Sequence, residues 1–418
     1  MKATVLFFLC TWLAVPVAFT QPIPVEEAVP YNFVYPQLNN IANLAGLEPF
    51  YAKLLRLKKE GKGPVRIVHI GDSHLQADLL TGVVRNRMQA CFGNAGRGLV
   101  FPYQLARSNA PPDILSSSNV SWQANRLAHP EIAIASGVAG FCIQTAAARP
   151  VINLSLKPTE DAAQLFTRVR IFTGPEQDTG LVLHADNNDT DYVLTRDTDS
   201  SLFLEAQLDQ PASSISLYPS LTPFQFYGAS FEKGDGGVLY HTIGVNGATY
   251  GQYNKALLFW QQLPALSADL YIISMGTNEA QKSHPDLATF KLELLAMVTK
   301  LKAASPDAAI LLTSPADSYF GGRTLSNPMK LISKALADFC AEQSLPFWDL
   351  YTITGGYGSA RSWAKGGLMS HDRIHYIKPG YELQGNLLFT ALAKGYNLYQ
   401  GRFNSPFELL EKLPGVNK

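Results

Sequence analysis

The run VRIVHIGDSH, from Val65 to His74, joins an apolar, β-branched segment to a polar turn. It predicts a buried strand that stops at Gly71-Asp72-Ser73, and Leu75 to Ala90 predicts the helix that follows. A serine at the tip of such a strand sits on a rigid sheet, where the N-terminus of the next helix favours developing negative charge. The same tripeptide also fits a plain turn with an N-capping serine. Other motifs must therefore separate a nucleophile from a cap.

Strands that alternate with helices return after about residue 226. Such alternation predicts a parallel sheet covered on both faces, and ligands of such sheets bind beyond the carboxyl ends of the strands. Ser73, Gly247 and Asn278 all fall at the carboxyl ends of predicted strands, so one fold would gather them. The predicted strands are Leu239–Gly247, Asp269–Met275, Ala308–Thr313 and Pro346–Leu350, and the predicted helices are Leu47–Lys59, Leu287–Ala303, Pro328–Gln343 and Tyr381–Tyr396.

The segment from 104 to 225 has a different character. Short β-rich pieces separated by turn residues replace the helical periods, which predicts an inserted all-β module. The glycine-rich stretch Gly93–Gly98 precedes it. A phosphate-binding loop should come directly after a strand, and this stretch follows a predicted helix, so we expect a flexible loop near the site.

The bulk composition is that of a globular protein. Hydrophobic residues make up 46% and charged residues 16% of 418, and Lys+Arg equals Asp+Glu at 34 each, which argues against a nucleic-acid partner. Residues 1–20 combine a basic start with an apolar run and predict a cleaved signal peptide, hence export to the periplasm or beyond the cell and no membrane span afterwards. Three cysteines then remain, Cys91, Cys142 and Cys340, an odd number that predicts no disulfide framework and leaves one bridge open.

A serine hydrolase needs a nucleophile, a base, a group that orients the base, and donors for the oxyanion. His375 is the candidate base for Ser73, and Asp372, three residues earlier on a polar loop, is spaced to reach its Nδ1. Candidate oxyanion donors are the backbone N–H groups of Ser73 and Gly247 and the side-chain amide of Asn278. Each residue alone also fits a turn or a cap.

Four motifs in chain order resemble the four sequence blocks of the SGNH (GDSL-type) hydrolase superfamily. They are Gly71-Asp72-Ser73, Gly244-Val245-Asn246-Gly247, Gly276-Thr277-Asn278 and Asp372-x-x-His375. The resemblance implies catalytic roles for Ser73, Gly247, Asn278 and His375, with Asp372 completing the triad.

The secreted peptidoglycan O-acetylesterases of that superfamily resemble the chain in three further features. Gln-Ala-Asp follows Gly-Asp-Ser-His at 71–78, Gly-Thr-Asn-Glu-Ala stands at 276–280, and a long insertion separates the first two blocks. His74 stands where most of the superfamily has leucine, and the O-acetylesterase subgroup also has histidine at this position.

The resemblance implies an α/β fold: a three-layer, parallel-sheet, flavodoxin-like hydrolase domain at 21–103 and 226–418. The module at 104–225 would be an inserted, jelly-roll-like β-sandwich of the carbohydrate-binding type. Its aromatic residues Tyr192, Phe203, Tyr218 and Phe224 are candidates to stack on sugars, although aromatic side chains more often pack in cores.

The implied activity is that of a serine esterase that removes O-acetyl groups from a cell-wall glycan, peptidoglycan first, through an acetyl-serine intermediate and without metal or organic cofactor. The partner would be an acetylated polysaccharide. Alternatives are an acetyl esterase or acetyltransferase acting on xylan or an exopolysaccharide, and a non-catalytic glycan-binding protein. A lipase-like esterase ranks last because no long apolar lid segment is present.

Overall fold

The structure, a computed structural model, describes residues 21–26, 29–128, 130, 133–158, 164–174, 180–194, 202–234 and 236–403. The predicted signal peptide, residues 1–20, lies outside this part of the chain. None of the helices in the described part is both long enough and apolar enough to cross a membrane. Cys91, Cys142 and Cys340 are all free thiols.

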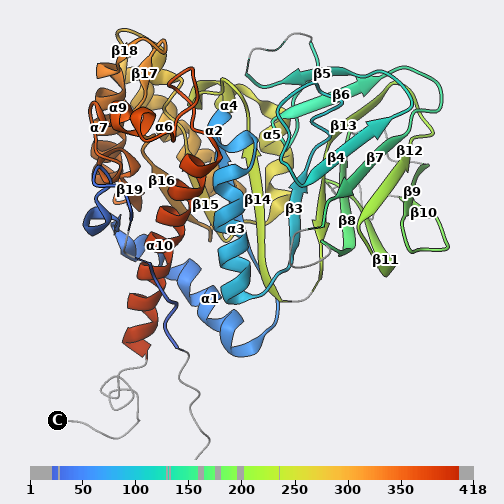
Figure 1. Ribbon diagram of the computed structural model, residues 1–418. Coiled ribbons are helices and arrows are strands. Elements are labelled where there is room, and N and C mark those ends of the chain that lie inside the picture. The colour runs from blue at the N-terminus through green and yellow to red at the C-terminus, as the bar shows by residue number, and fades with distance from the viewer. Residues whose placement is uncertain are drawn as a thin grey trace, which may run out of the picture.

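A parallel sheet forms the centre of the molecule (Figure 1). Its strands lie in the order β14-β2-β15-β16-β19, with β1 antiparallel at the β19 edge. Numbered along the chain, the five parallel strands have the order 2-1-3-4-5, which is flavodoxin-like. The predicted α/β class and its parallel sheet are therefore confirmed. The bounds are β1 (Ile41–Ala42), β2 (Pro64–Gly71), β14 (Gly237–Gly244), β15 (Leu270–Ser274), β16 (Ala309–Thr313) and β19 (Phe347–Trp348).

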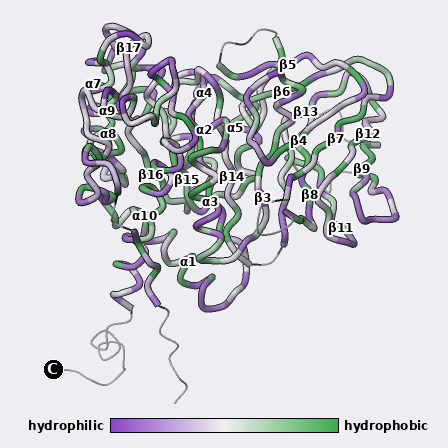
Figure 2. The backbone as a smooth tube through the Cα atoms, in the orientation of Figure 1, coloured by the Kyte–Doolittle hydropathy of each residue, from purple (hydrophilic) through white to green (hydrophobic). Residues whose placement is uncertain are grey.

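Helices cover both faces of this sheet, because successive side chains of each strand point to opposite faces. In β2, Val65 and Ile67 face the layer of α1, α3 and α10, whereas Val68 and Ile70 face the layer of α4 to α7. The first layer is α1 (Glu48–Glu60), α3 (Leu79–Phe92) and α10 (Lys378–Phe403); the second is α4 (Tyr250–Lys255), α5 (Leu257–Gln262), α6 (Leu287–Ala304) and α7 (Asn327–Glu342). Figure 2 shows hydrophobic residues along the central strands and hydrophilic ones at the end of α1.

Short elements complete the sheet edge at which the parallel strands end. They are α2 (Ser73–Gln76), β17 (Tyr319–Phe320), β18 (Thr324–Leu325), α8 (Leu350–Ile353) and α9 (Ser359–Lys365). In Figure 1, α2, α4 and the β17–β18 hairpin lie at the same end of the molecule, at the top of the view.

The predicted all-β module consists of two antiparallel sheets that share one core, as a sandwich does. One sheet has the order β10-β9-β12-β7-β4 and the other β11-β8-β13-β6-β5, with β3 paired to β13. The bounds are β3 (Gly96–Val100), β4 (Ile114–Ser118), β5 (Gln123–Arg126), β6 (Phe141–Thr145), β7 (Ile152–Leu156), β8 (Phe166–Thr173), β9 (Leu181–Ala185), β10 (Tyr192–Leu194), β11 (Leu204–Ala212), β12 (Ser214–Tyr218) and β13 (Phe224–Glu232). The paired strands thus run from 96 to 232, beyond the expected limits of 104 and 225.

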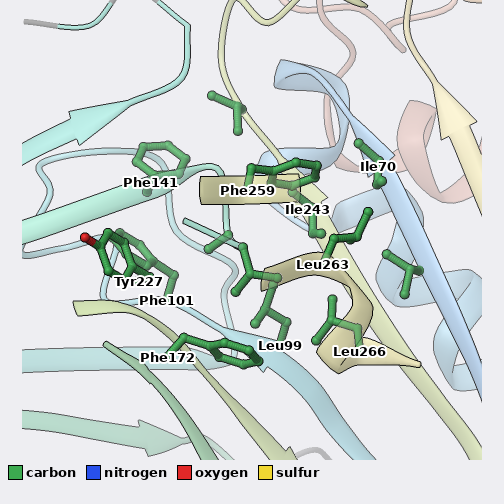
Figure 3. Packing of buried hydrophobic residues seen from close by; sticks show 14 of the residues in the cluster. Ile70, Leu99, Phe101, Phe141, Phe172, Tyr227, Ile243, Phe259, Leu263 and Leu266 are labelled. Carbon is green, nitrogen blue, oxygen red and sulfur yellow. The ribbon is translucent and has the colours of Figure 1, made fainter. Parts of the chain in front are cut away.

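The chain enters the module through β3 and leaves it through β13, and these two strands pair antiparallel. The ends of the insertion therefore lie side by side, directly before β14. One apolar cluster crosses this junction, with Ile70 and Ile243 from the parallel sheet and Leu99, Phe101 and Phe141 from the module (Figure 3).

Two local expectations are wrong. The glycine-rich stretch is not a flexible loop, because Gly96–Val100 forms β3; a Cβ at Gly98 would collide with the carbonyl of Tyr240, so glycine is needed for this close approach. The helix predicted over Leu75–Ala90 is broken into α2 and α3 at Asp78, which adopts a left-handed conformation with φ 56°.

The break at Asp78 is held by a buried ionic cluster. Its carboxylate pairs with Arg85 of α3 at 2.7 Å and with Arg97 of β3 at 2.6 Å, and it accepts a hydrogen bond from Thr242 of β14 at 3.0 Å. Arg97 also pairs with Asp113, just before β4, at 2.5 Å. The cluster thus joins the α/β layers to the module, and each of its charges has an opposite partner, as buried charges require.

An Asp78→Asn variant is expected to lower the free energy of unfolding by about 3–5 kcal/mol, because two buried guanidinium groups lose one carboxylate. Urea denaturation followed by circular dichroism measures this change. Asp338→Asn is the matched control: Asp338 pairs with Lys334 on the solvent-exposed side of a helix, where such pairs add little. Equal stability of the two variants would contradict the structural role given to the cluster.

Candidate active site

Ser73 follows β2 directly as the first residue of α2. The preceding Asp72 caps this short helix, since its Oδ1 accepts a hydrogen bond from the His74 N–H at 2.9 Å. The serine is therefore not the N-cap, which removes the plain-turn alternative for its side chain. Its hydroxyl oxygen instead lies 2.7 Å from Nε2 of His375, 302 residues further along the chain.

His375 and Asp372 form the second half of the arrangement. Nδ1 of His375 lies 2.7 Å from Oδ2 of Asp372. A carboxylate can only accept a hydrogen bond, so the proton sits on Nδ1, and Nε2 is left as the acceptor for the hydroxyl of Ser73. Ser73, His375 and Asp372, all singled out from the sequence, are thus brought together in the order that a nucleophile, base and orienting acid require.

The acid of this triad is exposed yet firmly held. Its Oδ1 accepts hydrogen bonds from Ser370 Oγ at 2.5 Å and from the N–H groups of Ile374 and His375 at 2.9 Å. Burial raises the pKa of Asp372, but the hydrogen bonds from Ser370, His375 and Ile374 outweigh this effect and hold the pKa well below its usual range. The side chains of His375 and Asp372 are 36% and 48% exposed, so the base is open to solvent.

The three expected oxyanion donors come from the ends of neighbouring strands. The N–H groups of Ser73 and Gly247 donate to no protein acceptor within the described residues, and Gly247 has φ 81°, a conformation that favours glycine. Asn278 differs from expectation in one respect. Its Nδ2 already donates to Ala248 O at 2.9 Å and lies 3.5 Å from Oδ2 of Asp72. Its amide therefore also ties the end of β15 to the loop after β14.

Gln76 is a site residue that had no role of its own in the sequence analysis. Its Oε1 accepts from the Asn246 N–H at 2.9 Å, and its Nε2 donates to Ser108 Oγ at 2.7 Å and to Asn109 O at 3.0 Å. It thereby holds the Gly247 loop and a module loop against α2. The Gln-Ala-Asp motif at 76–78 was the signal in the sequence.

A second histidine packs against the base. The ring centroids of His74 and His375 are 5.0 Å apart, and Nδ1 of His74 lies 3.0 Å from the hydroxyl of Tyr381. Burial lowers the pKa of His74 to about 3, so this ring stays neutral at neutral pH. Burial likewise raises the pKa of Asp72 to about 6. Within the described residues, no group of three or more His, Cys, Asp or Glu side chains is placed to hold a metal ion.

Comparisons with known proteins give one family match and several structural matches. Residues 220–383 match the GDSL-like lipase/acylhydrolase family. A solved peptidoglycan O-acetylesterase is 22% identical, with a TM-score of 0.72 over 86% of this chain and 99% of that one. Acylhydrolases from Enterococcus faecalis (22% identical, TM-score 0.30) and Bacteroides fragilis (20%, 0.31) each cover 38% of this chain, and 77% and 76% of their own. No curated protein matches the chain in sequence. The first of these structures confirms the expected SGNH hydrolase fold, and the family that residues 220–383 match is one of ester hydrolases.

An Asp372→Asn variant is expected to lose on the order of 10³–10⁴ in kcat, because an amide facing Nδ1 favours the tautomer that cannot accept the serine proton. Turnover of 4-nitrophenyl acetate measures this loss. Ser370→Ala serves as the control. In this variant Asp372 keeps the hydrogen bonds from both backbone N–H groups, so we expect a smaller loss of kcat than in Asp372→Asn. A loss below tenfold in Asp372→Asn would remove Asp372 from the triad.

Asn278→Ala is expected to lower kcat by about 10²–10³ when the amide stabilises the oxyanion. The alternative role, holding Ala248 in place, would appear as a lower melting temperature with a change in kcat below tenfold. Measuring both quantities on the same preparation separates the two roles.

Proposed function

We propose that this chain, whose residues 220–383 match the GDSL-like lipase/acylhydrolase family, is an ester hydrolase that removes O-acetyl groups from a cell-wall glycan, with peptidoglycan as the first candidate. The observation that carries the proposal is the hydrogen-bonded series Ser73–His375–Asp372, with 2.7 Å at both links. The likeness to a peptidoglycan O-acetylesterase spans the hydrolase layers and the module together and supports this substrate class.

The proposed reaction uses only side chains and backbone groups of this chain. Ser73 Oγ attacks the acetyl carbonyl carbon while His375 Nε2 takes the hydroxyl proton. The N–H groups of Ser73 and Gly247, with the amide of Asn278, stabilise the oxyanion. His375 returns its proton to the departing sugar hydroxyl, which leaves an acetyl-serine. Water, deprotonated by His375, then attacks this ester, and acetate and the free serine are released.

Transfer of the acetyl group to a second sugar is the alternative outcome of the same intermediate. The exposure of the His375 side chain favours hydrolysis, because water reaches the base from the solvent. We further propose that the protein is exported and acts outside the cytoplasm, on the strength of the signal pattern in residues 1–20.

Purified protein is expected to release acetate from O-acetylated peptidoglycan with a higher kcat/KM than from acetylated xylan, as measured by an enzyme-coupled acetate assay. Ser73→Ala should release none from either polymer, because no nucleophile remains. Transfer would instead appear as acetylated acceptor sugar without free acetate. Wild-type activity on xylan alone would reject the peptidoglycan assignment, and turnover by Ser73→Ala would reject the mechanism.

A further inference from the structure

The β module carries a pocket beside the active-site edge of the sheet. Its volume is about 350 Å³, within the range of about 300–1,000 Å³ that small-molecule sites occupy. It lies between β5, β6 and the loop 105–108. Figure 1 shows β5 and β6 at the same end of the molecule as α2 and α4. Neither the triad nor any proposed oxyanion donor lines it.

The pocket is positively charged. Arg107 and Arg126 line it, and none of its described lining residues is a carboxylate. Within the described part of the chain neither guanidinium pairs with an acid, and the Nε–H of Arg126 donates to Ala128 O at 3.2 Å. Elsewhere in the module, by contrast, Arg170 pairs with Glu205 at 2.7 Å. Two guanidinium groups that have no acidic partner among the described residues are suited to a carboxylate ligand, whose two oxygens match the planar donor fork.

The pocket also offers an aromatic surface. Trp122 is half-buried in its wall, and the indole N–H donates to Ser118 Oγ at 2.8 Å, which fixes the orientation of the ring. The ring packs edge-on against the buried Phe224, with centroids 6.4 Å apart. An amphipathic ring held in this way gives contact area at low entropic cost, and sugar rings are ligands of such surfaces.

The aromatic residues picked out from the sequence do not line this pocket. Phe224 is buried, Phe203 lies beneath the guanidinium of Arg170, and the hydroxyl of Tyr192 is engaged by Asn188. Tyr218 is exposed at the end of β12, in the other sheet of the module. The aromatic residues that line it are Trp122 and the buried Phe141, so Trp122 is the one with an exposed surface to offer.

One side chain joins the pocket to the reaction centre. Ser108 lines the pocket, and its Oγ accepts a hydrogen bond from Gln76, three residues after Ser73. The same Gln76 accepts from the N–H of Asn246, next to Gly247. A single side chain, Gln76, therefore joins the wall of the pocket to the loop next to Gly247.

We propose that this pocket is a subsite for a carboxylate carried by the acetylated glycan, with Trp122 beneath the sugar and Arg107 and Arg126 on the carboxylate. This inference rests on the proposed function and deepens it, because it specifies an anionic polymer. In peptidoglycan the carboxylate has two sources: the peptide stem, or the lactyl group left on the sugar when the stem is removed.

The test compares kcat/KM for O-acetylated glycan strands with kcat/KM for 4-nitrophenyl acetate, which carries no carboxylate. The ratio used is kcat/KM for the strands divided by kcat/KM for 4-nitrophenyl acetate. In each of the variants Arg107→Gln and Arg126→Gln we expect this ratio to fall about tenfold, because one charge-assisted contact is lost. The matched control is Arg149→Gln: Arg149 is exposed in the same module, outside the pocket, and has φ 51° where Arg107 has φ 52°. Its ratio is expected to stay at the wild-type value.

Strands with intact stems and amidase-treated strands distinguish the two sources. A fall that persists after stem removal assigns the lactyl carboxylate, and a fall that disappears assigns the stem; both support the subsite. An unchanged ratio in both pocket variants, with wild-type enzyme active on the strands, overturns the subsite and leaves the proposed function standing. An equal fall on neutral acetylated xylan also overturns it. Wild-type enzyme that hydrolyses only the small ester overturns the proposed function first, and the subsite with it.

Discussion

The arrangement of the site depends on the hydrogen bonds that the side-chain amide of Gln76 makes. This amide accepts the N–H of Asn246 after β14 and donates to Ser108 and Asn109 of the module, while its own helix begins at Ser73. Because parallel strands end at one edge of the sheet, their loops already lie close together, and a few directional hydrogen bonds suffice to fix their relative positions. Ser73, the Gly247 loop and the β module are thereby held in one arrangement.

Charged side chains are stabilised by ion pairs in the interior and by hydrogen bonds at the reaction centre. Asp78, Arg85 and Arg97 are buried and pair with one another, because an unpaired charge there would be costly. Asp372 is half exposed and stays ionised because it accepts hydrogen bonds from Ser370 and from the backbone of its own loop. The first arrangement stabilises the contact between hydrolase layers and module. The second keeps the base in the tautomer that the reaction needs while leaving it accessible to water.

Some features could be predicted from the sequence because they depend on local pattern. The apolar run before Ser73 predicted β2, and the spacing of Asp372 and His375 predicted a contact that lies within a single turn of chain. Other predictions failed for reasons outside the local sequence. The helix breaks at Asp78, whose left-handed conformation accompanies ion pairs with Arg85 of the next helix and Arg97 of β3. Gly96–Val100 forms a strand because β13, more than 120 residues later, offers a partner.

The sequence by itself predicted the class of the fold, the candidates Ser73, His375 and Asp372, and an all-β insertion, because periodicity, short spacings and short motifs can be read locally. Only the tertiary structure decided how the insertion faces the site, that Asn278 also tethers a neighbouring loop, and that Trp122, Arg107 and Arg126 share one pocket. These relations join residues of different strands and loops, and they arise from strand register and core packing, which no local pattern records.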